Sequence, residues 1–252
     1  MRAVQDDEGR TVSAPARGDR IVSLVPSLTE AVARTAPGVL VGATDWCTHP
    51  AELQLRRIRG TKNPEVGAII ELQPDLVLAN KEENRRPDLD TLRAAGLPVY
   101  VTDVRSVEGA FTSLRRMLEA ARLGYPAWLR EARQAWDRVA EPGRRRHAVV
   151  PIWRRPWRAL GSDTFAGDVL RRLGVDNVLA GSRERYPRFT PAALPPHDLV
   201  VLPDEPYAFT AVDGPEAFPD VPTALISGRL LTWYGPSLID AAAQLPAALH
   251  GR

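Results

Sequence analysis

The chain has 252 residues, and its 33 lysines and arginines are nearly balanced by 31 aspartates and glutamates, for a formal net charge of +2. A balance this even argues against a nucleic-acid-binding protein, which needs a strongly basic face. The length suffices for two lobes of ordinary size, each with its own core, and the single cysteine, Cys47, excludes an internal disulfide.

Residues 1–19 are polar and charged, and we expect them to form a flexible N-terminal segment. They contain no apolar stretch, no small-residue cleavage site and no lipobox cysteine, so the sequence as encoded predicts a cytoplasmic protein. No later apolar run approaches the roughly 20 residues that span a bilayer. We therefore expect no membrane-spanning helix.

Strands and helices alternate from residue 20 to residue 105. Short apolar runs predict four strands, at residues 20–25, 39–44, 75–80 and 99–102. Ser27-Leu-Thr-Glu30, directly after Pro26, is a capping-box pattern that predicts the start of the first helix. Further helices are expected at residues 65–72 and 87–95. This alternation is typical of βαβ units in a mainly parallel sheet.

The pattern is helical only from residue 106 to about residue 141, which predicts a connector over residues 106–143. Strands and helices then alternate again. Strands are expected at residues 148–153, 198–202 and 221–226, and helices at 165–173 and from Ser237. The sequence therefore predicts an α/β protein with two Rossmann-like lobes, residues 20–105 and 144–252.

Tryptophans follow several of the predicted strands. Trp46, Trp153, Trp157 and Trp233 all lie in loops that leave a short apolar run. Open α/β sheets bind ligands at the carboxyl ends of their strands, and large rings can stack on a flat ligand. The positions of these rings predict a ligand-binding site.

Other residues in the same loops extend the candidate site. Arg154 and Arg155 could donate paired hydrogen bonds to carboxylate, phosphate or catecholate oxygens. The candidate ligand-binding residues are Trp46, Cys47, His49, Lys62, Asn80, Trp153, Arg154, Arg155, Trp157, Tyr207, Phe209, Trp233 and Tyr234.

Some of these residues have a structural interpretation as well. Trp233 and Tyr234 could hold the last helix against the second lobe. Arg154 and Arg155 could form a solvated turn, and the charged residues 80–86 could be an exposed loop.

Direct metal binding and catalysis have less support. Cys47 and His49 are good ligand types, but two residues do not make a metal site and no zinc-type spacing exists in the chain. Cys47 or His49 could instead be an axial ligand to a metal that is already chelated. No G-x-S-x-G elbow, P-loop or G-x-G-x-x-G cradle is present, so we predict no catalytic residue.

An ordered series of motifs resembles the class III periplasmic binding proteins, which are receptors for cobalamin, ferric siderophores and haem. The motifs cover about residues 20–249 and are RIVSLVPSLTE from Arg20, VGATDWCTHP from Val41, GTKNP from Gly60, ELQPDLVLAN from Glu71 and LTWYGPSL from Leu231. Within the family they are similar to the cobalamin-binding, helical backbone metal receptor branch.

The resemblance implies two lobes joined by a single long backbone helix, here residues 126–141, with the ligand in the cleft between them. It implies reversible binding of a metal chelate or corrinoid by a monomer without enzymatic activity or cofactor, and delivery to an ABC permease. The surface glutamates that contact the permease would fall near Gly67 and Ala192, and neither residue is acidic. Two alternatives therefore stay open: a cytoplasmic carrier or sensor that acts without a permease, and an enzyme on the same scaffold.

Overall fold

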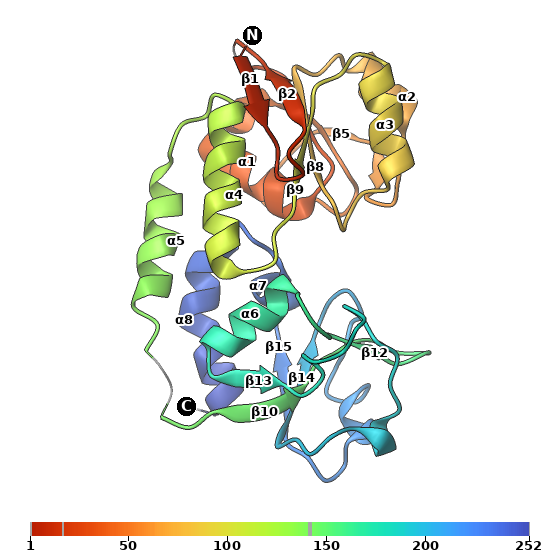
Figure 1. Ribbon diagram of the computed structural model, residues 1–252, viewed down its shortest axis with the longest axis vertical. Helices are drawn as coiled ribbons and strands as arrows, with labels where there is room; N and C mark the ends of the chain where they lie inside the picture. The colour runs from red at the N-terminus through yellow and green to blue at the C-terminus, as the bar shows by residue number, and fades with distance from the viewer. Residues whose placement is uncertain (1, 17, 141–142, 252) are drawn as a thin grey trace. The chain divides into compact units, whose positions relative to one another are not determined.

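The computed structural model describes residues 2–16, 18–140 and 143–251. The chain forms two compact α/β units, each with its own parallel sheet (Figure 1). Unit 1 consists of Met1–Val104, Glu108–Glu131 and Tyr234–Pro236, and unit 2 consists of Arg105–Val107, Ala132–Trp233 and Ser237–Arg252. The predicted α/β class with two lobes and mainly parallel sheets is confirmed.

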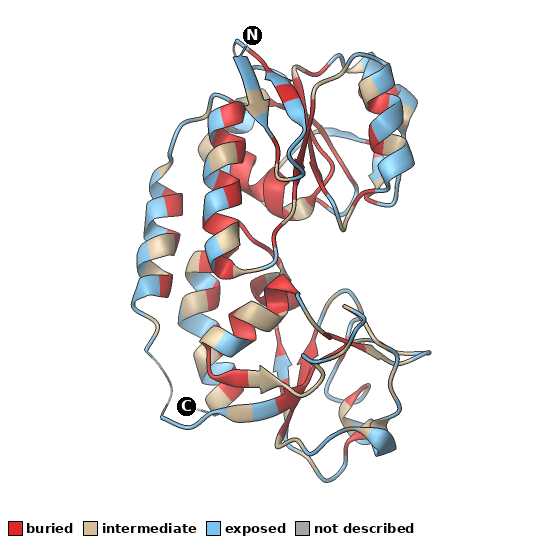
Figure 2. Ribbon diagram, viewed as in Figure 1, coloured by how far each residue is buried: buried red, intermediate tan, exposed pale blue. Residues whose placement is uncertain are grey.

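Unit 1 contains a five-stranded parallel sheet in the order β5-β4-β3-β8-β9. Its strands are β3 (Ile21–Ser23), β4 (Leu40–Ala43), β5 (Arg56–Arg57), β8 (Leu76–Asn80) and β9 (Val99–Thr102). Every residue of β3, β8 and β9 is buried (Figure 2), as expected for a parallel sheet covered on both faces. Because the strands are parallel, their carboxyl ends lie at one edge of the sheet.

Three helices and a small hairpin complete the first half of unit 1. They are α1 (Pro26–Thr35), a 3₁₀ turn (Pro37–Val39), α2 (Val66–Glu71), α3 (Arg86–Ala94), and the strands β6 (Arg59–Gly60) and β7 (Asn63–Pro64). The predicted capping box does not form, since Ser27 lies inside α1. Pro26 begins the helix instead, because its fixed φ and missing N–H suit the first helical position.

The N-terminus differs from the flexible segment expected for residues 1–19. β1 (Arg2–Gln5) and β2 (Thr11–Ala14) form an antiparallel hairpin, and its turn contacts the edge strand β9. The Asp7 backbone N–H donates to the Val101 carbonyl at 3.0 Å, and the Asp7 carboxylate accepts from the Asp103 N–H at 3.1 Å. Asp7, whose charge suggested a solvated segment, thus forms hydrogen bonds with backbone groups that edge strand β9 would otherwise leave unpaired.

The connector contains two helices, α4 (Val107–Ala120) and α5 (Ala127–Asp137). The helix predicted over residues 126–141 corresponds to α5, which ends earlier, while residues 141 and 142 lie outside the described ranges. The division between the two units falls within α5, between Glu131 and Ala132. Trp128 and Trp136 of this helix are buried, and their indole N–H groups donate to Thr35 and to the Leu238 carbonyl, each at 2.9 Å.

Unit 2 contains a four-stranded parallel sheet in the order β13-β10-β14-β15. Its elements are β10 (Arg146–Val149), α6 (Phe165–Arg172), β13 (Val175–Asn177), β14 (Leu199–Pro203), β15 (Thr223–Ile226), α7 (Gly228–Thr232), α8 (Ser237–His250) and two 3₁₀ turns (Pro191–Ala193 and Pro215–Ala217). Strand β13 was not predicted, because its three residues follow the α6 helix directly. In the described ranges, every helix is too short or too polar to cross a membrane.

The single strand predicted at residues 148–153 is divided in two. β10 ends at Val149, and β11 (Pro151–Trp153) leaves the sheet to pair antiparallel with β12 (Arg158–Ala159). These two strands and the turn between them form an arm, residues 151–159, at the carboxyl edge of the unit 2 sheet. The arm carries four of the predicted site residues.

Candidate functional site

The predicted residues of unit 1 lie in loops at the carboxyl edge of its sheet. Strand β4 leads into the loop of Trp46, Cys47 and His49, and strand β8 ends at Asn80. Lys62 lies in the turn of the β6–β7 hairpin. Tyr234 belongs to unit 1 although it comes late in the chain. The structure therefore brings these six residues to one lobe.

The loop after β4 exposes Trp46 and buries Cys47. The Trp46 side chain is 65% exposed, and its indole nitrogen lies over Gly60, where a Cβ would approach it to 3.3 Å. Cys47 is fully buried, and its sulfur contacts the hydroxyls of Thr29 at 3.0 Å and Thr44 at 3.2 Å. Burial raises the pKa of the Cys47 thiol, which keeps it protonated. A ligand cannot reach Cys47 without displacing this loop, whereas Trp46 is accessible.

Arg57 holds the same loop through hydrogen bonds to its backbone carbonyls. Its guanidinium donates to the carbonyls of Thr44 at 3.0 Å and Cys47 at 2.9 Å. His49 is partly exposed, and its Nδ1 lies 3.1 Å from the Thr48 hydroxyl. Nowhere in the described ranges do three His, Cys, Asp or Glu side chains gather as a metal site would require.

Asn80 supports the loop after β8 from inside the sheet. Its amide nitrogen donates to the Thr102 carbonyl at 3.0 Å, and its amide oxygen accepts from the backbone N–H groups of Glu82 at 2.8 Å and Glu83 at 3.2 Å. Asn84 closes the loop by donating to the carbonyls of Leu24 and Thr61. Asn80 is buried, so the structure gives it a positioning role beneath the site.

Glu83, Lys62 and Tyr234 form a cluster of titratable groups at this edge. The Lys62 ammonium donates to the Glu82 carbonyl, which places it over the loop after β8. Burial raises the pKa of the Glu83 carboxyl, and this effect outweighs the opposing influence of Lys62. The Tyr234 phenol is buried beside Thr102 and Glu83, and its pKa lies well above the ordinary value because of that burial and the nearby carboxylates. Sequence reasoning did not include Glu83 in the candidate site, because its burial depends on residues distant in the chain.

The segment that carries Tyr234 packs on the start of α1. The Tyr234 backbone N–H donates to the Ser27 hydroxyl at 3.3 Å, and a Cβ at Gly235 would lie 2.9 Å from the Ser27 carbonyl. Trp233 is buried in unit 2 under the Arg229 guanidinium, at 5.6 Å from the ring centroid. The structural interpretation of Trp233 therefore has direct support.

The arm of unit 2 presents one exposed ring and packs another, partly buried, against the core. Trp153 is 44% exposed and meets Tyr207 edge to face, with ring centroids 5.7 Å apart. Trp157 packs inward on Phe209 at 6.0 Å and Phe218 at 5.6 Å. Phe209 and Phe218 belong to a buried core with Val149, Ala159, Val200 and Leu202. Phe209 is therefore a core residue, and Trp157 packs against that core while staying partly exposed. Both rings fill the space between the arm and the sheet.

The two arginines of the arm also differ in exposure and in ion pairing. Arg154 forms ion pairs with Asp213 and Glu216 and lies 5.1 Å from the Trp157 ring centroid. The Gly214 N–H and the Arg154 guanidinium lower the pKa of Glu216, and the Tyr207 hydroxyl donates to Asp213 at 2.6 Å. Arg154 is therefore neutralised within unit 2, while Arg155 is exposed at the tip of the arm with a left-handed φ of 67°.

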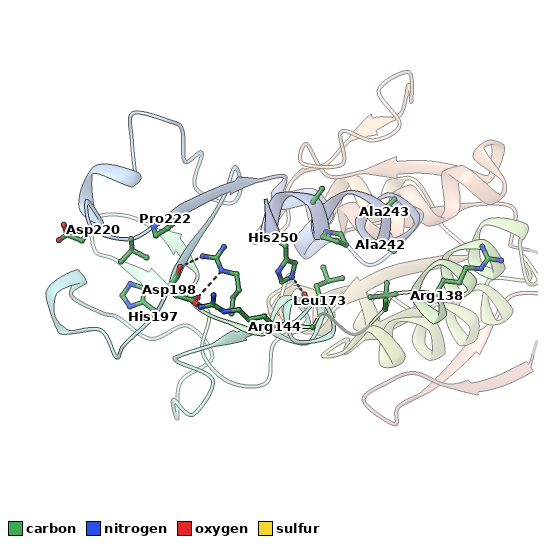
Figure 3. Close-up of a pocket in the computed structure, with 17 residues that line it drawn as sticks. Arg138, Arg144, Leu173, His197, Asp198, Asp220, Pro222, Ala242, Ala243 and His250 are labelled. Carbon is green, nitrogen blue, oxygen red and sulfur yellow. Dashed lines mark hydrogen bonds and ion pairs between the residues drawn. The ribbon is translucent and has the colours of Figure 1, made fainter. Parts of the chain in front are cut away.

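A large cavity lies elsewhere in unit 2. It has a volume of about 1090 Å³ and is lined by residues at or just before the starts of strands, such as Arg146, Asp198 and Pro222, together with residues of α8 (Figure 3). The Asp198 carboxylate forms ion pairs with Arg144 and Arg146. The Nε2 atom of His250 lies 2.7 Å from the Leu173 carbonyl oxygen. None of the predicted site residues lines this cavity, which is at the amino edge of the sheet.

Two α/β lobes with parallel sheets match the fold of solved class III periplasmic binding proteins. No family model matches the chain. The vitamin B12-binding protein of Pectobacterium carotovorum is 24% identical over 260 residues, which cover 94% of this chain and 90% of that protein.

Solved structures agree with this comparison. A periplasmic heme-binding protein from Pseudomonas aeruginosa has a TM-score of 0.75 at 23% identity, over 92% of this chain and 93% of that one. Helicobacter pylori CeuE with Ni(II) bound has a TM-score of 0.82 at 13% identity, over 100% of this chain and 89% of that one. The resemblance to class III periplasmic binding proteins is confirmed. Two of these three proteins are named for binding vitamin B12 or heme, and the third holds Ni(II); this agrees with the prediction of a binding protein rather than an enzyme.

Proposed function

We propose that this chain reversibly binds a metal chelate or a corrinoid. The observation that carries the proposal is the exposure of one large ring at the carboxyl edge of each sheet, Trp46 in unit 1 and Trp153 in unit 2. Monomeric proteins bury most indole surface, so such rings at the ligand edge of an α/β sheet favour a binding role. The similarity to proteins named for vitamin B12 and heme, and to a structure with Ni(II) bound, supports the same class of ligand.

The chemistry of the two edges suits a bulky, flat ligand. A stacked ring pair contributes about 0.5–1.5 kcal/mol beyond the buried area, and two chi angles per ring keep the entropy loss small. Arg155 and Lys62 add exposed cationic groups, one in each lobe. Asn80 holds the loop that Lys62 contacts, and Trp157 and Phe209 pack where the arm meets the core of unit 2.

Coupling to a permease is a separate matter. Gly67 and Ala192 occupy the positions at which the resemblance implies docking glutamates, and both are exposed without a carboxylate. This favours, as a second candidate, a carrier or sensor of a chelate that acts without a permease. Fractionation of native cells distinguishes the two, because an uptake receptor would be recovered outside the cytosol.

Ligand titration tests the binding function directly. Cyanocobalamin, haemin and a ferric siderophore would be added to the purified chain while tryptophan fluorescence is followed. We expect saturable quenching with at least one of them, and about tenfold weaker binding in Trp46→Ala or Trp153→Ala, the equivalent of about 1.4 kcal/mol. Tyr125→Ala removes an exposed ring outside these loops and serves as the matched control. A chain that responds to none of the three chelates would contradict the proposal.

A further inference from the structure

We propose that Arg154, Tyr207 and Asp213 form a clasp that fixes the exposed ring of the unit 2 arm in one orientation. The ring is the Trp153 indole, and the inference rests on the proposed function, in which this ring contacts the ligand. The clasp lies within unit 2, where the arm meets the loop that follows β14. Its members are positioning residues, although the sequence predicts Arg154 and Tyr207 as ligand contacts.

Tyr207 sets the orientation of the Trp153 ring. The two ring planes meet at 78° with their centroids 5.7 Å apart, which is the edge-to-face arrangement. This arrangement is favourable because the positive edge of one ring points at the negative face of the other, so the attraction weakens when either ring turns. A half-exposed indole has few other contacts to choose among its rotamers. The contact with Tyr207 therefore selects one of them.

Tyr207 is itself held at both ends. Its hydroxyl donates to the Asp213 carboxylate at 2.6 Å, and hydrogen bonds to a charged acceptor are among the stronger ones. Its ring centroid lies 4.7 Å from that of Phe209, which belongs to the buried core of unit 2. The phenol cannot turn without losing one of these contacts. Tyr207 therefore connects the exposed ring to a fixed part of the fold.

Asp213 returns the chain of contacts to the arm. Its other carboxylate oxygen forms an ion pair with Arg154, the residue that directly follows Trp153. The Asp213 backbone N–H donates to the Thr210 hydroxyl at 3.1 Å, and the Asp213 carbonyl accepts from the Thr210 N–H at 3.0 Å. The contacts thus close a circuit that begins and ends on neighbouring residues of the arm.

The charges of the clasp are matched inside unit 2. The Arg154 side chain is 17% exposed, and its two terminal nitrogens pair with Asp213 and Glu216. This use of two nitrogens needs the guanidinium fork, because a lysine ammonium is a single point charge. A ligand that took the donors of Arg154 or Tyr207 would leave the Asp213 carboxylate without them, which costs free energy. These donors therefore suit the holding of the arm better than the binding of a ligand.

A ring that is ordered in the free protein favours binding. Ordering a side chain during binding costs conformational entropy, and a ring that is already fixed does not incur this cost again. The clasp therefore prepares the edge of unit 2 for a ligand that it does not touch.

The experiment measures Kd by fluorescence with cyanocobalamin, haemin and a ferric siderophore as probes. Tyr207→Phe removes the hydroxyl and keeps the ring, while Arg154→Lys keeps the charge and removes the fork. For a probe that the parent chain binds, each substitution should weaken binding about fivefold. In a Trp153→Ala background each should change Kd by less than about twofold, because no ring remains to be positioned. Tyr125→Phe, which removes a phenol hydroxyl in unit 1, is the matched control.

Other outcomes overturn the inference. If Tyr207→Phe weakens binding equally with and without the Trp153 ring, its hydroxyl contacts the ligand and is not a positioning group. If neither Tyr207→Phe nor Arg154→Lys changes Kd in the parent chain, the clasp has no part in binding while the binding function stands. If the parent chain binds none of the probes, the proposed function fails, and the fixing of the ring is still decided without ligand.

That measurement is ¹⁹F NMR of the chain labelled with 5-fluorotryptophan. Trp153 is assigned from the signal missing in Trp153→Phe. We expect one sharp Trp153 signal in the parent chain and a shifted or broadened one in Tyr207→Phe, with the signals of Trp128 and Trp136 unchanged because the variant is folded. An unchanged Trp153 signal in Tyr207→Phe would contradict the clasp.

Discussion

At the scale of single residues, burial decides the chemistry of the carboxyl edge of unit 1. Cys47 and Glu83 both lie in loops that leave strands, and burial raises the pKa of each side chain above its ordinary value because it disfavours the charged form. Trp46, the immediate neighbour of Cys47, is exposed. Adjacent residues of one loop, Trp46 and Cys47, therefore differ completely in their access to a ligand.

The burial of Cys47 predicts an inert thiol. Only the thiolate attacks disulfide reagents, and here the thiol is shielded and its pKa is raised. We expect its reaction with dithionitrobenzoate in the folded chain to be at least about 100-fold slower than after unfolding in urea, because local opening must come first. Rapid labelling of the native chain at neutral pH would show that Cys47 is accessible.

The raised pKa of Glu83 predicts a dependence of stability on pH. The folded chain binds this proton more tightly than the unfolded chain, whose glutamate has the ordinary value of 4.5. The contribution of Glu83 to stability therefore falls as the pH rises from about 4.5 to the folded pKa. Glutamine has no proton to lose, so the urea midpoint of Glu83→Gln relative to the parent should be higher at pH 8 than at pH 4. An equal difference at both pH values would contradict this assignment.

At the scale of elements, the structure depends on close backbone contact between distant segments. The start of α1 and the segment Tyr234–Pro236 approach so closely that a Cβ on Gly235 would lie 2.9 Å from the Ser27 carbonyl. The hairpin β1–β2 likewise completes the edge of β9 from the other end of the chain. Contacts of this kind hold Tyr234 in the candidate site.

Two glycine substitutions should change the free energy of unfolding in opposite directions. Gly235→Ala tests the contact with α1, and Gly67→Ala is a control in open space. Gly235→Ala forces the α1 contact apart and should lower the free energy of unfolding by about 1–3 kcal/mol. Gly67→Ala places a methyl group in open space on helix α2 and should raise it by about 0.5 kcal/mol, because alanine favours the helix. Urea titration followed by circular dichroism measures both. An unchanged free energy of unfolding in Gly235→Ala would mean that the segment does not pack on α1 as described.

At the scale of the whole molecule, each unit has a complete sheet with its own buried strands. The accessible aromatic and cationic groups are divided between them, with Trp46 and Lys62 in one unit and Trp153 and Arg155 in the other. Under the proposed function each set contributes to ligand binding, and the single variants of Trp46 and Trp153 measure the two contributions separately.

Ligand binding should therefore stabilise the folded chain measurably. A chelate present at about 100 times its Kd adds about 2.7 kcal/mol, which for a chain of this size raises the melting temperature by about 5–10 °C. Differential scanning fluorimetry or calorimetry checks this with each chelate. The double variant Trp46→Ala, Trp153→Ala should lose most of the shift, and an undiminished shift would place the ligand elsewhere, such as in the cavity at Arg146 and Asp198.

Much of the fold could be predicted because local patterns encode it. The apolar runs at residues 75–80 and 99–102 became β8 and β9 with almost the predicted bounds, since fully buried parallel strands need continuous apolar sequence. The N-terminal hairpin and the arm at residues 151–159 could not be predicted in the same way. Both depend on partners outside their own segment, such as Val101 for the hairpin.

The sequence by itself determined the class of protein: alternating strands and helices in two lobes, with tryptophans placed after strands, because periodicity and loop position are local properties. The tertiary structure alone decided which of those side chains are accessible. Trp46 stays outside while Phe209 enters a core, and Arg154 is neutralised by Asp213 and Glu216, which lie about sixty residues further along the chain. Exposure, ion pairing and the protonation of Glu83 depend on neighbours that only folding brings together.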